Sequence, residues 1–487
     1  MSRFSTLTSY LLVLLVSNAL ASISSTTLNE MNAMLLASST ASGIISTVAG
    51  NFTYLGGSTA DGIAAIGARL DYPRSVVIDK NGNLLISEGD ADRIRLITTS
   101  TGIITTVAGT GVSGFGGDGG QATSAKLNDP RGLDVDKFGN IFIADSGNNL
   151  IRKIIVSTGV ISTLAGNREY GYNGDNIAAT SASLCDPNDV AVDTSGNIFI
   201  ADRSNKRVRK VTASTGIITT IAGGNLGSFW VRDISNQNVF SPAGVIATAY
   251  TLGSPVGVTL DASGNVFIAG GSVDRVVYKL TVSTGNISVA AGSGNGGYSD
   301  DNILATRVFL DTPWKVAFDA TGNMFISERK LLGWNPTGKI RKVTASTGIM
   351  TTVAGSGDDA LGGWRYEDQT SWRYKEIVSP NGITVDPLGN FYFCDAFLHV
   401  VRKVTYPAIT ITPLPSTSVT PAPSVKPTPS FSMAPTSSAS LLFIPTAAPS
   451  SFTSMAPTSS ASSSSSPVLV IILLLISLLV LHLHLGI

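Results

Sequence analysis

The sequence predicts an all-β fold built from six similar repeats. The string D-x-x-G-N recurs six times along the chain, at intervals of 57, 57, 68, 58 and 67 residues. Each copy stands between short runs of β-branched and apolar residues, and each repeat has room for four strands. Six four-stranded repeats are what a six-bladed β-propeller requires. The six copies begin at Asp79, Asp136, Asp193, Asp261, Asp319 and Asp386.

Within a repeat, the first two strands are expected to form a hairpin around D-x-x-G-N. In the second repeat, Gly132–Val135 precedes this turn and Ile141–Ala144 follows it. A Gly-Asn pair between two β-rich runs is a hairpin signal. The third strand carries an I/V-R-K run, as at Ile151–Lys153, and an S-T-G turn leads into a fourth strand such as Ile103–Gly109.

The fourth-strand motif indicates how the ring closes. It occurs at 44–50, 103–109, 160–166, 217–223, 287–292 and 349–355, whereas the last repeat, 380–405, has no fourth strand of its own. Residues 44–50 are therefore expected to supply the outer strand of the final blade. Closure leaves only the short, Thr-rich outer strands as sheet edges.

The N-terminus has the pattern of a secretory signal peptide over residues 1–21. One cation, Arg3, precedes the apolar stretch Tyr10–Val16, and Ala19–Ala21 forms a small-residue cleavage site. A buried N-terminal helix is the alternative, but nothing amphipathic follows. Residues 22–42 are then a linker to the propeller, which spans 43–405.

Residues 406–466 are rich in Ser, Thr and Pro and carry a single charge, Lys426. Such a segment cannot bury enough apolar surface to offset the entropy of ordering it. We expect a disordered, O-glycosylated stalk.

Residues 467–487 contain the apolar run Val468–Leu485, which no Lys or Arg follows. Small residues before such a tail, with attachment at Ser459 or Ser460, are typical of a GPI-anchor signal. A transmembrane segment is the alternative. Either reading predicts a chain that enters the secretory pathway and is held at the extracellular face of the plasma membrane by its C-terminal anchor.

Composition excludes several classes of function. The formal net charge is zero and no basic stripe occurs, so nucleic acid is not an expected partner. Three His and two Cys cannot supply a multi-histidine zinc site, a four-cysteine zinc site or a disulfide framework. Cys185 and Cys394 belong to opposite blades and are expected to be unpaired.

The repeat pattern P-x-G-[VIL]-x-[VL]-D-x-x-G-N-[IL]-[FY]-[IV]-A-D, followed by I-R-K-V, resembles the NHL family of β-propellers. The linker Gly117–Leu127 and its copy Gly174–Leu184 resemble the extracellular and bacterial secreted branch, which includes the propeller of teneurins. The resemblance covers residues 43–405. It implies the fold and a binding platform, and it leaves the ligand unspecified.

Two sets of charged residues repeat from blade to blade. An acidic residue 12 positions before the blade-opening proline is expected to N-cap a short helix, rather than begin a Ca²⁺ loop. The acid that ends the second strand and the arginine of the third strand are expected to cap turns and form surface pairs. The first set is Asp61, Asp118, Asp175, Asp301 and Asp368; the second is Glu88, Asp145, Asp202, Glu328 and Asp395, with Arg95, Arg152, Arg209, Arg341 and Arg402.

Departures from the repeat are where a binding site is expected. The residue after each blade-opening proline begins the innermost strand, near one mouth of the central channel. Long linkers precede blades four and six, and blade five has an insertion at Arg329–Gly338; up-and-down blades place all three on the same face. The channel residues are Arg74, Arg131, Asn188, Val256, Trp314 and Asn381.

All the tryptophans of the chain fall on this face. The sixth-blade linker also repeats Trp-Arg-Tyr, and Trp, Tyr and Arg dominate binding hot spots. We expect a protein or glycan ligand there; the alternative is that the tryptophans fill the bases of longer loops. The residues are Trp230, Trp314, Trp334, Trp364 and Trp372, together with Arg365.

The rival hypothesis is a metal-dependent hydrolase or lyase with Ca²⁺ in the channel. Asp134, Asp189, Asn188 and Asn381 could contribute oxygen ligands, but two arginines at the same mouth oppose a cation unless they pair with those aspartates. His399 is the only histidine of the propeller, which disfavours a lyase site. We expect no enzyme activity, no metal and no cofactor.

Two N-x-S/T sequons predict N-glycosylation, at Asn51 and Asn286.

Overall fold

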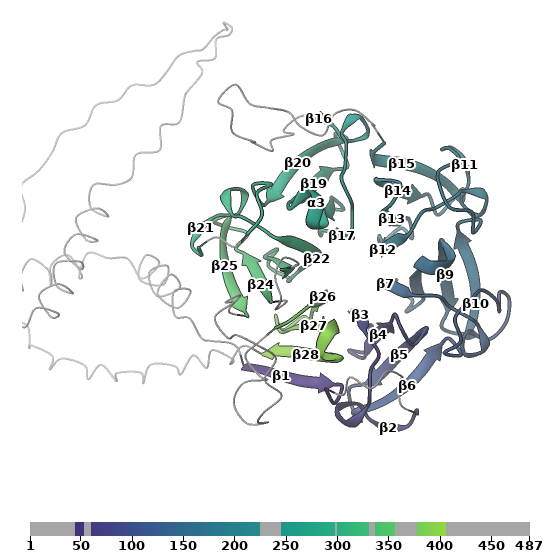
Figure 1. The fold of residues 1–487 in the computed structure, drawn as a ribbon. Coiled ribbons are helices and arrows are strands. Elements are labelled where there is room, and N and C mark those ends of the chain that lie inside the picture. The colour runs from purple at the N-terminus through teal and green to yellow at the C-terminus, as the bar shows by residue number, and fades with distance from the viewer. Residues whose placement is uncertain are drawn as a thin grey trace, which may run out of the picture. The chain divides into compact units, whose positions relative to one another are not determined.

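The computed structural model describes residues 44–52, 60–224, 245–297, 300–330, 337–355 and 377–405. In these ranges, all within the unit Met1–Ile411, the strands form six antiparallel sheets arranged around a central axis (Figure 1). Each sheet contains the four expected strands, and the first strand of each repeat lies innermost. The all-β, six-bladed propeller is confirmed.

The strands of the first three blades follow the order expected from the repeats. Blade one contains β3 (Pro73–Ile78), β4 (Leu84–Glu88), β5 (Arg93–Thr98) and β6 (Ile103–Ala108). Blade two contains β7 (Pro130–Val135), β8 (Ile141–Asp145), β9 (Leu150–Ile155) and β10 (Val160–Ala165). Blade three contains β12 (Pro187–Val192), β13 (Ile198–Asp202), β14 (Arg207–Val211) and β15 (Ile217–Gly223).

The remaining blades repeat this order, except that the last one takes its outer strand from the N-terminal end. Blade four contains β17 (Gly257–Leu260), β18 (Val266–Ala269), β19 (Val277–Thr281) and β20 (Asn286–Ala291). Blade five contains β22 (Thr312–Phe318), β23 (Met324–Arg329), β24 (Gly338–Val343) and β25 (Ile349–Ala354). Blade six contains β26 (Pro380–Val385), β27 (Phe391–Asp395), β28 (Val400–Thr405) and β1 (Ile44–Ala49).

Strand β1 closes the ring, as the motif count predicts. It pairs antiparallel with β28, from Ile44 opposite Thr405 to Ala49 opposite Val401. A hydrogen bond from the Tyr72 amide to Nδ1 of His399, 3.1 Å long, also joins blade one to blade six. Two segments more than 300 residues apart therefore share one sheet and one blade interface (Figure 1).

The D-x-x-G-N turn forms for local reasons. In blade one, Oδ1 of Asp79 accepts the amides of Asn81 and Asn83, both at 2.8 Å, and Nδ2 of Asn83 donates to Oδ2 of Asp79. Gly82 has φ of +79°, a left-handed conformation that glycine adopts without a Cβ penalty.

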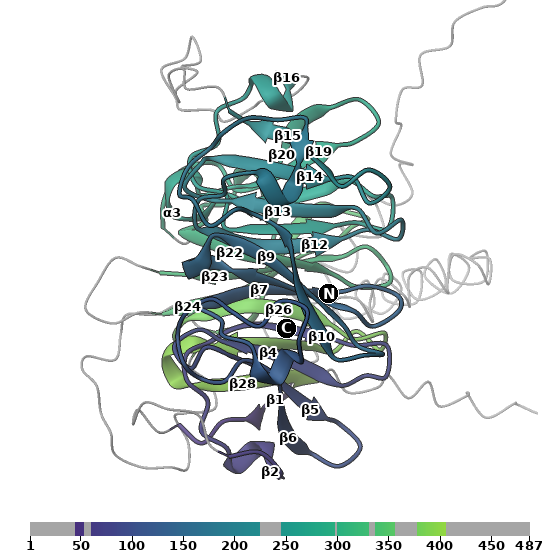
Figure 2. The ribbon, with the colours of Figure 1, turned by 90° about the vertical axis from the view of Figure 1, so that its right-hand side faces the viewer.

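The outer edges are less open than expected, because the linkers cover them. A two-residue strand of the linker pairs with the outer strand of blades one, three, four and five. Figure 2 shows two of these strands, β2 and β16, at the outside of the ring. In blade two, Gln121 makes a single bridge to Val160. The four strands are β2 (Ile63–Ala64), β11 (Ile177–Ala178), β16 (Val245–Ile246) and β21 (Ile303–Leu304).

A short 3-10 helix follows each of these edge segments, and further one-turn helices join second to third strands. In the second linker Ala122, Ala125 and Leu127 are buried, so the apolar side of the linker packs on the sheet as expected. The linker helices are η1 (Ala65–Gly67), η2 (Ala122–Ser124), η4 (Ala179–Ser181), η5 (Ala247–Ala249) and η6 (Ala305–Arg307); the others are η3 (Ser146–Asn148), α3 (Gly271–Asp274) and η7 (Ala396–Leu398).

The hydrophobic core lies between neighbouring blades. Side chains such as Ile86 and Leu84 of blade one pack with Tyr392 and Val401 of blade six, and each other pair of neighbours has a similar cluster. Because each cluster needs two blades, a single repeat could not bury its faces alone.

The repeated charges are not surface pairs; that prediction is wrong. Arg95 and Glu88 are both 0% exposed and lie 3.1 Å apart between Nη1 and Oε2. Glu88 also accepts the amide of Asp71 at 2.8 Å, so it ties the second strand to the incoming linker. The arginine and the acid are buried in the other blades that carry them, because the linker folds over the end of the third strand.

The linker aspartate is not a helix cap, so the second prediction is also wrong. Oδ1 of Asp61 lies 3.1 Å from Nη2 of Arg95 and accepts the hydroxyl of Thr106 at 2.9 Å. The residue that caps the following 3-10 helix is Ala64, which has no side chain to do so. Asp118, Asp175 and Asp301 make the same two contacts in their blades, and Asp368 lies outside the described residues. Thus each of these aspartates extends a buried acid–arginine pair to the outer strand.

The predicted signal peptide, linker, stalk and C-terminal anchor lie outside the described residues, as do Ser459 and Ser460. Among the residues that are described, no helix has the length and apolar character needed to span a membrane.

Candidate functional site at the channel mouth

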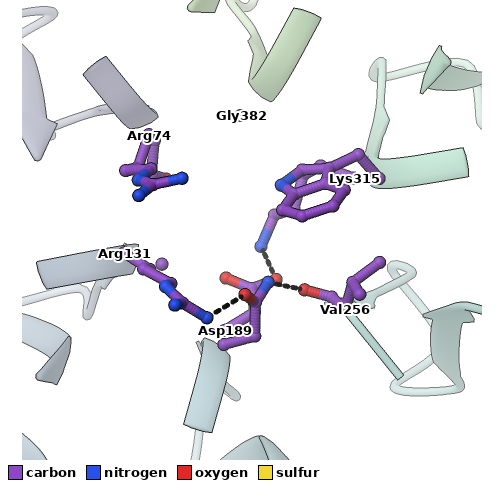
Figure 3. A pocket seen from close by; sticks show the side chains of 10 residues that line it. Arg74, Arg131, Asp189, Val256, Lys315 and Gly382 are labelled. Carbon is purple, nitrogen blue, oxygen red and sulfur yellow. Dashed lines mark hydrogen bonds and ion pairs between the residues drawn. The ribbon is translucent and has the colours of Figure 1, made fainter. Parts of the chain in front are cut away.

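The start of each innermost strand surrounds a pocket on the axis of the propeller (Figure 3). Of the six predicted channel residues, Arg74, Arg131, Asn188, Val256 and Trp314 line it, and Asn381 adjoins the lining residue Gly382. The spacing of the repeats therefore located the mouth correctly. The other lining residues are Ser75, Gly132, Asp189 and Lys315.

The pocket is small. The space open to the centres of water-sized groups is about 20 Å³, and one water needs roughly 10–15 Å³ by this measure. A water, an ion or the end of a side chain fits there, whereas the bulk of any organic ligand would remain outside, on the face around the mouth.

Blades one to three surround the mouth with paired charges. Arg74 lies 3.2 Å from Asp129, and its guanidinium stacks 4.2 Å from the ring centre of Tyr72. Arg131 lies between Asp129 and Asp186, with both nitrogen to oxygen distances 2.7 Å. Each arginine on this side thus has a carboxylate partner.

Asn188 links this side of the mouth to the next blade. Its Oδ1 accepts a hydrogen bond of 3.0 Å from Nη1 of Arg131, and its Nδ2 donates to the carbonyl oxygen of Val256. Asn188 is 3% exposed and both ends of its amide are satisfied, so it is held in one orientation.

Deeper in the channel, Asp189 pairs with Lys315 rather than with an arginine (Figure 3). Nζ of Lys315 also donates to the carbonyl of Val258 at 3.0 Å, and Oδ2 of Asp189 accepts the Val258 amide at 2.8 Å. Burial raises the pKa of Asp189, while Lys315 lowers it. Lys315 therefore supplies the counter-charge of Asp189 inside the channel.

Asp134, the other acidic departure, supports the backbone. It accepts the amides of Val135 and Val192, both at 2.8 Å, and burial raises its pKa to about 6. In the part of the chain that the structure describes, no group of three His, Cys, Asp or Glu side chains could hold a metal ion.

Blades five and six surround the mouth differently. Arg329, the last residue of β23, is 8% exposed, and its guanidinium stacks 4.3 Å from the ring centre of Trp314. Its Nη1 donates to Oδ1 of Asn381 at 3.0 Å. Burial is the main cause that lowers the pKa of Arg329 to about 10; Tyr72 opposes this shift, and Arg74 and Arg203 add to it with smaller effects.

Sequence reasoning missed Arg203, Arg329 and Lys315. Arg203 and Arg329 occupy the same place in blades three and five, directly after the acid that ends the second strand. The other blades with that acid have a small residue there: Gly89, Ser146 or Ala396. The two arginines at this position could therefore have been recognised in the sequence as departures from the repeat.

Several other predicted site residues lie outside the described residues: Trp230, Trp334, Trp364, Arg365 and Trp372. Of the two sequon asparagines, Asn51 is half-buried and donates to the carbonyl of Gly67, and Asn286 is half-buried at the start of β20. Cys185 and Cys394 are buried and form no disulfide, as expected.

Fold and site together define a six-bladed propeller whose channel mouth carries charged and aromatic side chains. The family model described as the teneurin NHL domain matches residues 112–173 and 169–362. The chain belongs to the NHL-repeat β-propeller family.

Two curated relatives each match about half of this chain. Mouse Teneurin-4 is 27% identical over 230 residues, which cover 44% of this chain and 8% of Teneurin-4. NHL repeat-containing protein 2 of Bos taurus is 24% identical over 280 residues, which cover 53% of this chain and 36% of the relative. The chain thus spans well under half the length of these relatives.

A solved structure of an auxiliary nutrient binding protein from Bacteroides thetaiotaomicron has a similar fold. Its TM-score is 0.51 at 15% identity, with 75% of this chain and 76% of that chain covered. At this identity the likeness extends to the fold alone.

Proposed function

We propose that this protein is a cell-surface recognition or adhesion protein that binds a protein or glycan ligand on the channel-mouth face of its propeller. The observation that carries the proposal is the concentration of departures from the repeat at one mouth. Arg74, Arg131, Trp314 and Arg329 all contribute to this face, and they come from blades one, two and five. Membership of the NHL family supports a binding role.

The size of the pocket favours binding over catalysis. A pocket of about 20 Å³ by the measure above holds no organic substrate, and Lys315 already neutralises Asp189 within it. The face around the mouth is a larger surface and is available to a macromolecule. The long linkers before blades four and six lead directly into innermost strands that begin at this mouth.

The tryptophan-rich linker before blade six supplies the test. In the full-length protein displayed on cells, Trp364→Ala, Trp372→Ala and Arg365→Ala together are expected to abolish binding to ligand-bearing cells and to leave the unfolding temperature nearly unchanged. Leu388→Ala is the matched control, because Leu388 is 87% exposed in the hairpin turn of blade six. Undiminished cell binding by the triple variant would contradict the proposal.

We propose further that the C-terminal segment attaches the propeller to the outer membrane surface through a GPI anchor. Phosphatidylinositol-specific phospholipase C is then expected to release the protein from intact cells. Retention of the protein after treatment would favour a transmembrane segment instead.

A further inference from the structure

Arg329 is a buried cation that has no carboxylate partner among the described residues. It is 8% exposed, and its contacts among the described residues are the Trp314 ring and the amide oxygen of Asn381. No carboxylate among the described residues contributes to its pKa, which burial lowers most, Tyr72 raises, and Arg74 and Arg203 lower further. Burying a charge is costly unless an opposite charge compensates it.

The equivalent arginine in blade three has the partner that Arg329 lacks. Nη1 of Arg203 lies 3.0 Å from Oδ2 of Asp186, the residue directly before the blade-opening proline. In blade five that position is Thr312, which pairs with Arg329 across β22 and β23. The exchange of Asp for Thr therefore removes from blade five the negative charge that blade three places beside its arginine.

The neighbours of Arg329 present further unused hydrogen-bond donors. Oγ1 of Thr312 and Nδ2 of Asn381 are buried and make no hydrogen bond within the described structure. The amide of Asn381 cannot be reversed, because its oxygen accepts from Arg329 and a reversed amide would place two donors together. In the counterpart Asn188, the same nitrogen donates to the carbonyl oxygen of Val256. The unused amide donor is therefore found at Asn381 and not at Asn188.

We propose that Arg329, Asn381 and Thr312 form a binding site for the carboxylate of an acidic side chain, Asp or Glu, on a protein ligand. The ligand supplies at blade five the group that Asp186 supplies at blade three. A guanidinium binds a carboxylate through two parallel hydrogen bonds, and the nearby amide and hydroxyl can donate to the same oxygens. This inference rests on the proposed function, because it assigns a ligand group to the same face.

An acidic side chain suits the observations better than a larger anion. Arg329 stacks on Trp314, which lines the mouth, and the chain itself places an aspartate against the equivalent arginine of blade three. Arg329 also covers the face of Trp314, so that ring face is not available for stacking on a sugar.

The test uses a minimal acidic probe and the full-length protein. N-acetyl-aspartate N-methylamide is titrated by saturation-transfer NMR, with N-acetyl-asparagine N-methylamide as the neutral probe of the same shape. We expect the acidic probe to bind at least about tenfold more tightly, because only it can pair with the guanidinium. Equal binding of the two probes would overturn the proposal.

Thr312 provides a matched pair of variants. Thr312→Asp places an internal carboxylate beside Arg329, as in blade three. The affinity of this variant for the acidic probe is expected to fall at least about tenfold. Thr312→Asn has nearly the volume of the aspartate without its charge, so it should bind the acidic probe at least about tenfold more tightly than Thr312→Asp does. Unfolding temperatures confirm that both variants fold. Equal affinities in the two variants, or tighter binding of glucuronate than of the acidic probe, would refute an acidic side-chain site.

The same variants separate this inference from the proposed function. If Thr312→Asp loses the probe but still binds ligand-bearing cells, the carboxylate site stands and its use in recognition fails. If the acidic probe does not bind the wild type while the tryptophan variant loses cell binding, the recognition face stands and the carboxylate site fails.

Discussion

Blades three and four each hold the incoming linker with a buried acid, but in different ways. In blade three, Asp202 accepts the amide of Cys185 and faces Arg209, whose Nη2 lies 2.9 Å from Asp175 of the linker. In blade four the acid comes from helix α3 instead of the second strand: Asp274 accepts the amide of Gly253 at 2.9 and 3.0 Å, and Tyr278 replaces the arginine.

The difference concerns charge rather than shape. Tyr278 and Asp274 are both 0% exposed, and the hydroxyl of Tyr278 lies 3.4 Å from that of Tyr250. Burial raises the pKa of Asp274 to about 7, above the value of about 6 to which burial raises that of Asp202, beside Arg209. A buried acid can therefore hold the linker either as part of an ion pair, as in blade three, or within a nearly neutral hydrogen-bond network, as in blade four.

Breaking the blade-three ion pair should have the largest effect. Arg209→Met leaves Asp202 buried without its cation, and removing one partner of a buried pair costs about 3–5 kcal/mol. Urea unfolding of the full-length protein measures the loss. Lys210→Met, one residue away on the outer side of the strand, should change stability by less than about 0.5 kcal/mol. Similar losses in both variants would show that burial of Arg209 is not decisive.

The blade-four network should make stability depend on pH. The folded pKa of Asp274, about 7, exceeds the unfolded value of about 3.9, so the folded state retains a proton that the unfolded state releases. The contribution of Asp274 is fully present below pH about 4 and is lost as the pH rises through about 7.

Asp274→Asn isolates this effect from the other buried carboxyls. The wild type should lose stability between pH 4 and pH 8 as Asp274 ionises, whereas asparagine does not ionise. The free energy of unfolding of the variant, relative to that of the wild type, should therefore rise by on the order of 3 kcal/mol over this range. Parallel stability profiles for the two proteins across this range would contradict a raised pKa at Asp274.

Removing the tyrosine hydroxyl should have a smaller effect. The hydrogen bond from Tyr278 lowers the pKa of Asp274, so Tyr278→Phe should raise that pKa further and cost about 1 kcal/mol at neutral pH. The midpoint of the pH-dependent stability loss provides the measurement. A midpoint that does not move would exclude Tyr278 as a donor to Asp274.

The smallest effect is expected at the outer end of the blade-three connection. The hydroxyl of Thr220 donates to Asp175 at 3.0 Å, and Asp175 is 26% exposed. Thr220→Val should cost about 0.5–1 kcal/mol, because water can replace the lost hydrogen bond. A loss as large as that of Arg209→Met would mean that Asp175 is held mainly by this threonine.

The channel mouth shows how far spacing alone can locate a site. Arg74, Arg131 and Asn188 were placed at the mouth by their position after a blade-opening proline, and all three line the pocket. Their partners were not predictable in this way. Asp129 and Asp186 each directly precede a blade-opening proline, and Lys315 pairs with Asp189, which is 126 positions away in the sequence.

The buried acid–arginine pairs show the limit of reading charge from sequence. A charge that recurs in nearly every blade resembles a solvated surface pattern, yet Arg95 and Glu88 are fully buried. Their burial depends on the linker, whose Asp61 and Asp71 close over the strand ends. A periodicity of two along a strand gives the side-chain face, but it does not reveal what covers the end of that strand.

The sequence by itself determined the number of blades, the order of strands and the closure by residues 44–49, because turn residues and alternating apolar runs act over short distances. The tertiary structure alone decided which charges meet. Arg203 pairs with Asp186, whereas Arg329 has no carboxylate among the described residues, although each follows the acid that ends the second strand of its blade. That outcome depends on residues that only the closed ring brings together, since electrostatic pairing depends on distance in space and not along the chain.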